Sequence, residues 1–253
     1  MRKIIFVAIW SALLAACTTD SYDSGDTPLS YLSAEWADVT TNGDGLVAYA
    51  VTDGGQRLTF SPPYQAQWLK QKADTTCRAL LYHGQVVEGV TSVKGLTPVL
   101  MAGVVDRKEG MAVKKDPIGN ARAWFSADKR YLNLVLTIKV GRKENAPTQQ
   151  KIGIVRDSVT TLADGTRCCW LTLAHDQNDV PDYYSQDACV SVPAAVLHEV
   201  GKVCLRVATT QGERLLEIQY PPLSLTTIDA TSFRSRAPQD VLLLLSASDS
   251  PQG

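Results

Sequence analysis

Apolar and polar residues alternate along most of this chain, which is the two-residue period of β-strands with one buried face. In the first region the alternating runs are separated by glycine-bearing turns such as Asp53-Gly54-Gly55, an arrangement that predicts β-hairpins. One helical turn is expected within residues 62–73. The strands expected here are residues 31–40, 46–51, 57–60, 76–82, 85–93 and 99–105. Short strands at this spacing predict a small barrel or sandwich over residues 31–105.

A second series of alternating runs follows residues 106–120, a Lys- and Gly-bearing stretch that we interpret as a linker. The strands expected beyond it are residues 121–125, 130–140, 149–155, 166–175, 188–192, 201–209 and 213–220. Runs of this length and spacing predict a β-sandwich over residues 121–222, with a helical turn at 193–199. In the C-terminal tail, residues 223–253, the apolar segment 241–245 is too short to span a membrane and is expected to form a late edge strand.

The first sixteen residues have the pattern of a secretory signal peptide. Two basic residues precede an apolar run over residues 4–16, and Leu14-Ala15-Ala16-Cys17 resembles the bacterial lipobox, in which the cysteine is acylated. The alternative is an ordinary cleaved signal with a cysteine there by chance. We expect lipidation of Cys17, because small residues stand directly before a cysteine at the end of the apolar run. Residues 17–30 are expected to form a flexible tether, since they are polar and have no apolar periodicity.

The net charge narrows the classes of partner, and the cysteine content limits the disulfides that can form. A net charge of −1 disfavours a nucleic-acid partner, although basic residues gather in 106–150 and could form a patch there. Export permits disulfides, but five cysteines remain after Cys17, so at least one would be unpaired. If the strands that hold Cys169 and Cys189 pair, these two form the candidate disulfide; buried free thiols are the alternative that we favour. The five cysteines are Cys77, Cys168, Cys169, Cys189 and Cys204.

No motif in the sequence identifies a catalytic or phosphate-binding site, so we expect a protein that is not an enzyme and needs no cofactor. A polar loop carries several oxygen ligands that could hold calcium, but it lacks the glycine and the distant glutamate of an EF-hand loop. A solvated hairpin loop is the alternative that we favour. The candidate ligands are Asp176, Asn178, Asp179 and Asp182.

Aromatic residues of the first region could stack on sugar rings if they are exposed, as they do on barrels that bind oligosaccharides. Aromatic residues in alternating strands more often belong to the core. The residues concerned are Tyr31, Trp36, Tyr64, Trp68 and Tyr82.

The order of these features resembles the NigD-like lipoproteins of the Bacteroidota. The matching residues are Asp53-Gly54-Gly55, Asp116-Pro117-Ile118, Trp124, Tyr131-Leu132-Asn133-Leu134, Leu171-Thr172-Leu173-Ala174-His175, Asp179 and the strand from Leu215 to Tyr220. The resemblance covers residues 14–222. It implies an OB-like N-terminal domain and a C-terminal β-sandwich, and the family has no established enzymatic activity. With the lipobox, we expect a lipid anchor in the outer membrane of the bacterial envelope.

We therefore expect an envelope lipoprotein, anchored through its lipid, that binds another envelope protein or a glycan without catalysis. One alternative is a hydrolase that acts on cell-wall or other glycans through carboxylates in a cleft. Another is a structural or immunity-type component of the envelope that has no ligand. Two facing carboxylates in a deep polar cleft would favour the hydrolase, whereas exposed aromatic residues would favour binding. The sequence leaves open which face of the outer membrane the domains occupy.

Overall fold

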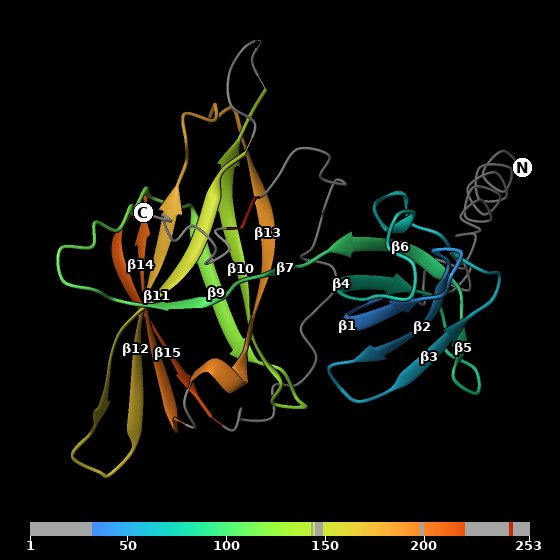
Figure 1. Cartoon of the computed structure of the whole chain (residues 1–253), viewed down its shortest axis with the longest axis horizontal. Helices are drawn as coiled ribbons and strands as arrows, with labels where there is room; N and C mark the ends of the chain where they lie inside the picture. Colours follow the sequence, from blue (N-terminus) through green and yellow to red (C-terminus); the bar gives the residue numbers. More distant parts are fainter. Residues whose placement is uncertain (1–31, 143, 145–148, 198–199, 221–242, 245–253) are drawn as a thin grey trace, which may run out of the picture.

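The computed structural model describes residues 32–142, 144, 149–197, 200–220 and 243–244. These residues form β-strands and short 3₁₀ helices, with no α-helix among them, in two bodies that lie side by side (Figure 1). The predicted all-β architecture is confirmed. The signal peptide, Cys17 and the tether lie outside the described residues. Within the described ranges, no helix is long and apolar enough to cross a membrane.

The first body is a single curled sheet in the strand order β5-β3-β2-β1-β4-β6, which forms the OB-like barrel. Its strands are β1 (Ser33–Thr41), β2 (Val47–Thr52), β3 (Arg57–Phe60), β4 (Thr76–His83), β5 (Val90–Thr91) and β6 (Val93–Pro98). The helical turn expected in 62–73 is the 3₁₀ helix η1 (Gln67–Leu69). The prediction of one strand over 85–93 is wrong, because Glu88 and Gly89 both have positive φ angles and turn the chain before β5.

Alternation along β1 and β4 gives the barrel two differently used faces. Ala37, Val39 and Leu81 are fully buried in the barrel core. The residues between them face the second body, because successive side chains of a strand point to opposite sides. The outward residues are Trp36 and Asp38 on β1, and Arg78 and Leu80 on β4, and all four are buried. The barrel therefore has a second packing surface, which covers the sandwich.

The second body is the predicted β-sandwich, with sheets in the orders β7-β13-β10-β9 and β15-β14-β12-β11-β16. Its longer strands are β9 (Asn120–Phe125), β10 (Tyr131–Val140), β11 (Lys151–Thr161), β12 (Arg167–Asp176), β13 (Tyr184–Pro193), β14 (Lys202–Thr209) and β15 (Gly212–Gln219). Leu132, Leu134 and Leu136 of β10 point into the core between the sheets, where they meet residues such as Leu171 and Leu205. The predicted turn at 193–199 is the 3₁₀ helix η2 (Ala194–Leu197).

The predicted boundary between the domains is wrong, because residues 100–105 pair with strands of the sandwich and not with the barrel. They form β7 (Leu100–Met101), which pairs with β13, and β8 (Val104–Asp106), which pairs with β11. The chain thus leaves the barrel directly into both sheets of the sandwich. Residues 106–120 are not a free linker either, since Ile118 is fully buried and forms a bridge to Thr209.

The segment 241–245, expected as an edge strand, contains β16 (Leu243–Leu244). This strand pairs in parallel with β11 at Lys151 and Ile152, on the same side of β11 as β8. The prediction of a late edge strand is confirmed, and the rest of the tail lies outside the described residues.

Candidate binding pocket and domain joint

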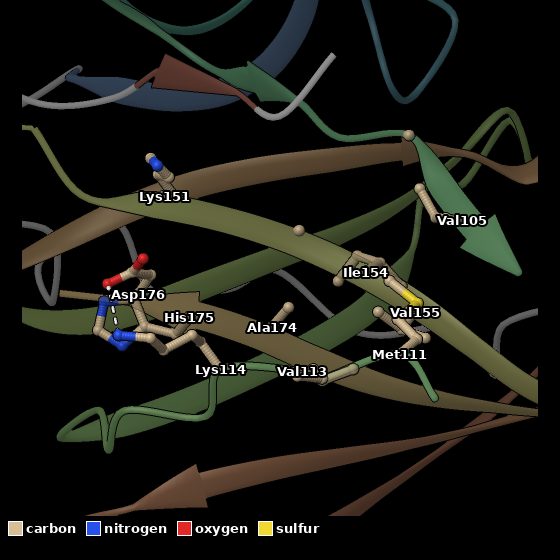
Figure 2. Close-up of a pocket in the computed structure, with 13 residues that line it drawn as sticks. Val105, Met111, Val113, Lys114, Lys151, Ile154, Val155, Ala174, His175 and Asp176 are labelled. Atoms are coloured by element: carbon tan, nitrogen blue, oxygen red, sulfur yellow. Dashed lines mark ion pairs between the residues drawn. The ribbon is translucent and has the colours of Figure 1, made fainter. Parts of the chain in front are cut away.

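A pocket with a volume of about 220 Å³ opens on the outer face of the β11–β12 sheet (Figure 2). Gly153 and Val155 of β11 and Ala174 of β12 form its floor, because these positions point away from the sandwich core. Residues 107–119, which we call the strap, pass over this face and then join the sheet beside the end of β12, where Lys115 bridges to His175 and Ile118 bridges to Thr209. The strap and β8 supply the apolar wall of the pocket, through Val105, Met111, Ala112 and Val113.

Charged side chains stand at the mouth of the pocket. Lys114 of the strap and Asp176 at the end of β12 form an ion pair of 3.6 Å between Nζ and Oδ1. Lys151 is exposed beside them. Asp176 is the one carboxylate among the residues that line the pocket. The pocket can therefore hold a small apolar group next to charged residues, but it does not present the pair of carboxylates that glycoside hydrolysis requires.

The strap is fastened next to the pocket by His175 of β12. The His175 backbone N–H donates to the Lys114 carbonyl at 3.0 Å, and the Asp116 N–H donates to the His175 carbonyl at 2.9 Å. The imidazole is buried, with Nδ1 2.8 Å from the Asp116 carbonyl oxygen and Nε2 2.7 Å from Gln150 Oε1. Since both ring nitrogens are occupied, His175 holds the strap in place and is not free to act on a ligand.

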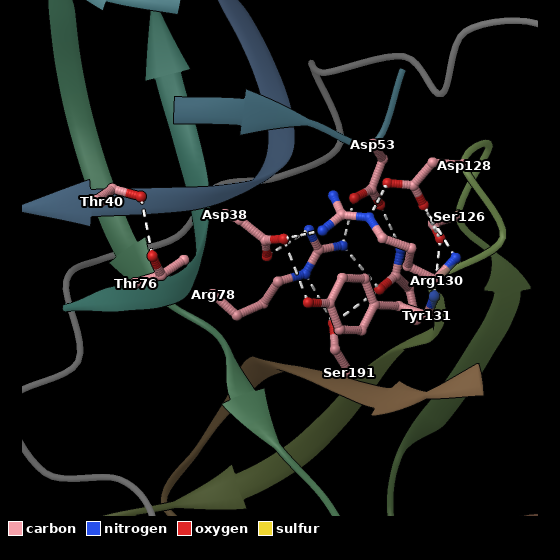
Figure 3. A network of polar contacts seen from close by, with 11 residues as sticks. Asp38, Thr40, Asp53, Thr76, Arg78, Ser126, Asp128, Arg130, Tyr131 and Ser191 are labelled. Carbon is pink, nitrogen blue, oxygen red and sulfur yellow. Dashed lines mark hydrogen bonds and ion pairs between the residues drawn. The ribbon is translucent and has the colours of Figure 1, made fainter. Parts of the chain in front are cut away.

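A second polar cluster joins the two domains, and Arg78 of the barrel lies at its centre (Figure 3). The Arg78 side chain is 1% exposed. Its guanidinium forms ion pairs with Asp53 at 2.5 Å and Asp38 at 3.4 Å, both within the barrel. It also donates to Asn133 Oδ1 and Ser191 Oγ of the sandwich, each at 3.3 Å. We call the whole contact between barrel and sandwich around Arg78 the domain joint; it also includes the polar and apolar residues described in the next paragraphs.

The sandwich adds a hairpin to the domain joint from the other side. Arg130 forms an ion pair with Asp38 of the barrel, and the Tyr131 hydroxyl donates to Asp38 at 3.2 Å. Asp128 positions Arg130 by accepting from its Nε at 2.6 Å. The backbone N–H of Asp128 donates to the Asp53 carbonyl at 3.0 Å. The two domains are therefore linked by backbone and side-chain contacts at once, which fixes their relative orientation.

Burial determines how the domain joint titrates. It raises the pKa of the Asp53 carboxyl, although Arg78 and the Asn133 amide act in the opposite direction. Burial likewise raises the pKa of the Tyr131 hydroxyl. The domain joint thus contains a carboxylate, that of Asp53, whose ionised form would destabilise the fold if Arg78 were absent.

Apolar residues complete the domain joint beside Arg78. Trp36 of β1 packs against Trp124 of β9, with ring centroids 5.5 Å apart and planes at 88°. Leu80, Val99 and Val135 are buried around them. Edge-to-face aromatic pairs of this kind are favourable beyond their burial. The joint consequently combines an apolar contact with a fully paired buried charge.

The predicted calcium loop is a hydrogen-bonded turn. Asp176 Oδ1 accepts from the Asn178 backbone N–H at 2.9 Å, and Asn178 Nδ2 donates to the Gln149 carbonyl. Asp179 and Asp182 are exposed. Over the residues that the structure describes, no three His, Cys, Asp or Glu side chains gather closely enough to hold a metal ion. The favoured alternative, a solvated polar loop, fits this arrangement.

The candidate disulfide between Cys169 and Cys189 is not formed, because β12 and β13 do not pair and lie in different sheets. Cys169 is buried in the core between the sheets, whereas Cys189 packs against the apolar part of the domain joint. Both are free thiols. Burial raises the pKa of Cys169 to about 11 and that of Cys189 to about 12.

Most of the aromatic residues considered for sugar stacking are packed instead. Tyr64 and Trp68 lie against the barrel core, and Trp36 and Tyr82 belong to the domain joint. Tyr31 lies outside the described residues. Within the described part of the chain, the large exposed aromatic residues are Tyr183 and Tyr184, which carry no motif in the sequence.

Comparison with known proteins identifies the family to which the sandwich belongs. Residues 103–220 match the model of the NigD-like C-terminal β-sandwich domain. The chain belongs to the NigD-like family. No curated protein has a sequence that matches it significantly.

Solved structures from related bacteria share the NigD-like fold. A NigD-like immunity protein from Bacteroides caccae has a TM-score of 0.55 at 20% identity, covering 73% of this chain and 90% of its own. A protein described as a candidate lipoprotein, from Bacteroides fragilis, has a TM-score of 0.58 at 13% identity, with coverages of 76% and 99%. At these identities the likeness establishes the fold.

The NigD-like motifs read from the sequence meet at two places in the structure. Asp53, Trp124, Tyr131 and Asn133 all lie in the domain joint. Asp116 and His175 meet where the strap is fastened beside the pocket. In this NigD-like protein, therefore, the motif residues hold the domains and the strap in position, and the exposed tyrosines lie outside the motifs.

Proposed function

We propose that this protein is a lipid-anchored, non-catalytic envelope protein that binds a partner protein through the end of the sandwich that carries Tyr183 and Tyr184. The observation that carries the proposal is the exposure of these adjacent rings, at 65% and 57%. Tyrosine is enriched in protein interfaces, because it buries a large apolar ring while its hydroxyl keeps a polar contact.

The local structure holds this surface in a defined conformation. Tyr184 begins β13 and pairs with Val140 of β10. Tyr183 lies against Gly141, where an added Cβ would come within 2.9 Å of the tyrosine ring and 2.8 Å of the Pro181 carbonyl oxygen. A side chain presented in one conformation loses less entropy when it binds, so the tyrosines are suited to act as anchors.

Two further observations support binding rather than hydrolysis. The pocket is lined by a single carboxylate, Asp176, which is paired with Lys114, whereas a glycoside hydrolase needs two carboxylates. In addition, one solved neighbour is described as an immunity protein. That description favours a NigD-like protein that acts through contact with another molecule.

The tyrosine surface is tested by crosslinking in intact envelopes. A photo-crosslinking amino acid at position 184 is expected to give one reproducible protein adduct, and the same group at Leu215, which is 46% exposed on β15, is expected to give none. The double substitution Tyr183→Ala and Tyr184→Ala should remove a crosslink formed from a third position, Asp182, while changing the Tm little, because both rings are exposed. Equal adducts from positions 184 and 215 would contradict the proposal, and an adduct to a glycan would assign the surface to carbohydrate.

The lipid anchor is tested by replacing Cys17. The variant Cys17→Ala is expected to leave the membrane fraction, because the acyl chains that hold the protein on the bilayer attach to this thiol. Fractionation followed by immunoblotting measures the change, with Cys77→Ala as the control that should stay bound. A Cys17→Ala protein that remains in the membrane fraction would show that the protein is held there by something other than the lipid.

A further inference from the structure

Two cysteines of the sandwich that lie far apart in the sequence are in contact with each other. Cys168 Sγ is 3.0 Å from Cys204 Sγ, and the two side chains are 0% and 1% exposed. Unbonded sulfur atoms do not normally approach so closely, and a disulfide needs a further shortening to about 2.0 Å. The remaining distance is small compared with the reach of a cysteine side-chain rotation.

The strand pairing explains why these thiols meet. β12 and β14 are neighbouring parallel strands in which Cys168 pairs with Lys202 and Trp170 pairs with Cys204. Cys168 and Cys204 are therefore two positions apart along the same face of the sheet. That face is the outer one, because the adjacent Cys169 and Val203 point into the sandwich core.

We propose that Cys168 and Cys204 form a structural disulfide in the exported protein, which crosslinks β12 to β14. The oxidant is a disulfide-bearing thiol oxidase of the envelope. One thiolate attacks that disulfide and releases one of its sulfurs as a thiol, and the second thiolate then attacks the mixed disulfide. Overall the two cysteines lose two electrons and two protons and gain the Sγ–Sγ bond, while the oxidant's disulfide becomes two thiols.

Burial determines when the bond can form and how long it lasts. In the folded chain burial raises the pKa of the Cys204 thiol to about 12, so its reactive thiolate is scarce. Oxidation is therefore expected before β12 and β14 close on each other during folding. Once formed, the bond is shielded from reductants by the same burial. The proposal rests on export through the N-terminal signal, and it is independent of the tyrosine surface.

Peptide mapping of the full chain, extracted from membranes with detergent, tests this bond. Free thiols are alkylated under denaturing conditions without reductant, and the digest is analysed by mass spectrometry. The peptides that carry Cys168 and Cys204 are expected to be linked, and Cys77 is expected to be alkylated. Because Cys168 and Cys169 share a peptide, the link is expected to persist in Cys169→Ala and to disappear in Cys168→Ala. Alkylation of both Cys168 and Cys204 in the extracted wild-type protein would overturn the proposal, as would a link that survives in Cys168→Ala.

A melting experiment gives a second measurement that does not depend on mapping. After unfolding in reductant, which exposes the buried bond, and refolding in its presence, the wild-type protein is expected to melt about 5–10 °C lower than the untreated protein, because an open bond frees the unfolded chain between the two cysteines. The same treatment should not change the Tm of the double variant Cys168→Ala and Cys204→Ala. A wild-type Tm that is unchanged after this treatment would contradict a structural disulfide. Recovery of the wild-type protein in the membrane fraction shows separately that export took place.

Discussion

Replacing Arg78 with methionine is expected to lower the free energy of unfolding by about 3–5 kcal/mol, because the change leaves Asp53 of the domain joint without its cation, while Asp38 keeps Arg130. Arg78 contacts both domains, since it pairs with Asp38 and Asp53 in the barrel and donates to Asn133 and Ser191 in the sandwich. Its loss should therefore also weaken the coupling between the domains. We expect calorimetry to show two separated unfolding transitions in the variant where the wild-type protein shows one.

The effect of Arg78→Met should depend on pH in a defined direction. Burial already raises the pKa of Asp53, and removing Arg78 raises it further because the opposing positive charge is gone. A carboxyl whose folded pKa lies above its unfolded value, about 3.9, stabilises the fold at low pH and loses that contribution as the pH rises through the folded pKa. The difference in stability between wild type and variant should thus grow from pH 4 to pH 7, as measured by urea unfolding.

Arg107→Met is the matched control, because Arg107 also pairs with an aspartate but lies near the surface and within one domain. Its Nε is 2.7 Å from Asp157 Oδ1, and its side chain is 35% exposed. Exposed ion pairs contribute about 0–1 kcal/mol, so this variant should unfold almost as the wild type does. Similar losses in the two variants would show that Arg78 contributes no more than an exposed ion pair, and a loss in Arg78→Met that is equal at both pH values would show that Asp53 is not left unpaired. A single unfolding transition in Arg78→Met would show that Arg78 does not couple the domains.

Replacing Trp36 with alanine is expected to cost about 3–5 kcal/mol, the range found for removing a large buried aromatic side chain. Trp36 is buried in the domain joint, where it makes an edge-to-face contact with Trp124 of the sandwich. Its removal leaves a cavity between domains that the fixed strands around it cannot close. Urea unfolding followed by the fluorescence of the other tryptophans measures the loss.

Trp36→Phe provides the control for this cavity, since it keeps an aromatic ring facing Trp124 and should recover much of the stability. The double variant Trp36→Ala and Arg78→Met tests whether the two residues act in one joint. Because the Arg78 guanidinium carbon lies 5.8 Å from the Trp36 ring centroid, the two losses should not simply add. Strict additivity would mean that the apolar and charged parts of the joint act independently.

The strands of this protein could be predicted from the sequence because most of them have one buried face and one solvated face. The run 57–60 coincides with β3, and the runs near β9, β10, β12, β14 and β15 are displaced by only one or two residues. The pattern failed at residues 99–105, whose apolar character was correct but whose pairing partners, β13 and β11, lie far away in the sequence. Periodicity identifies a strand and does not identify the sheet to which it belongs.

The domain joint could have been suspected from two positions. Arg78 is the one charged residue in the segment from Cys77 to Tyr82, and Asn133 stands between two leucines of β10. Polar residues in otherwise apolar runs indicate buried, paired groups. Their partners Asp38 and Asp53 resemble ordinary strand and turn aspartates, so the ion pairs themselves could not be predicted. The pocket could not be predicted from the sequence either, because its wall comes from a segment that resembled a linker.

The short strand β7 has a consequence for cutting this protein into pieces. The family domain begins at residue 103, between β7 and β8, so a fragment that starts there lacks the segment that pairs with Val190 and Ser191 of β13. The fragment would expose a bare strand edge together with the apolar surface around Val135, and such edges recruit other chains. A truncated sandwich should therefore aggregate during refolding, whereas the barrel, which is synthesised first, supplies the cover that the sandwich needs as it leaves the ribosome.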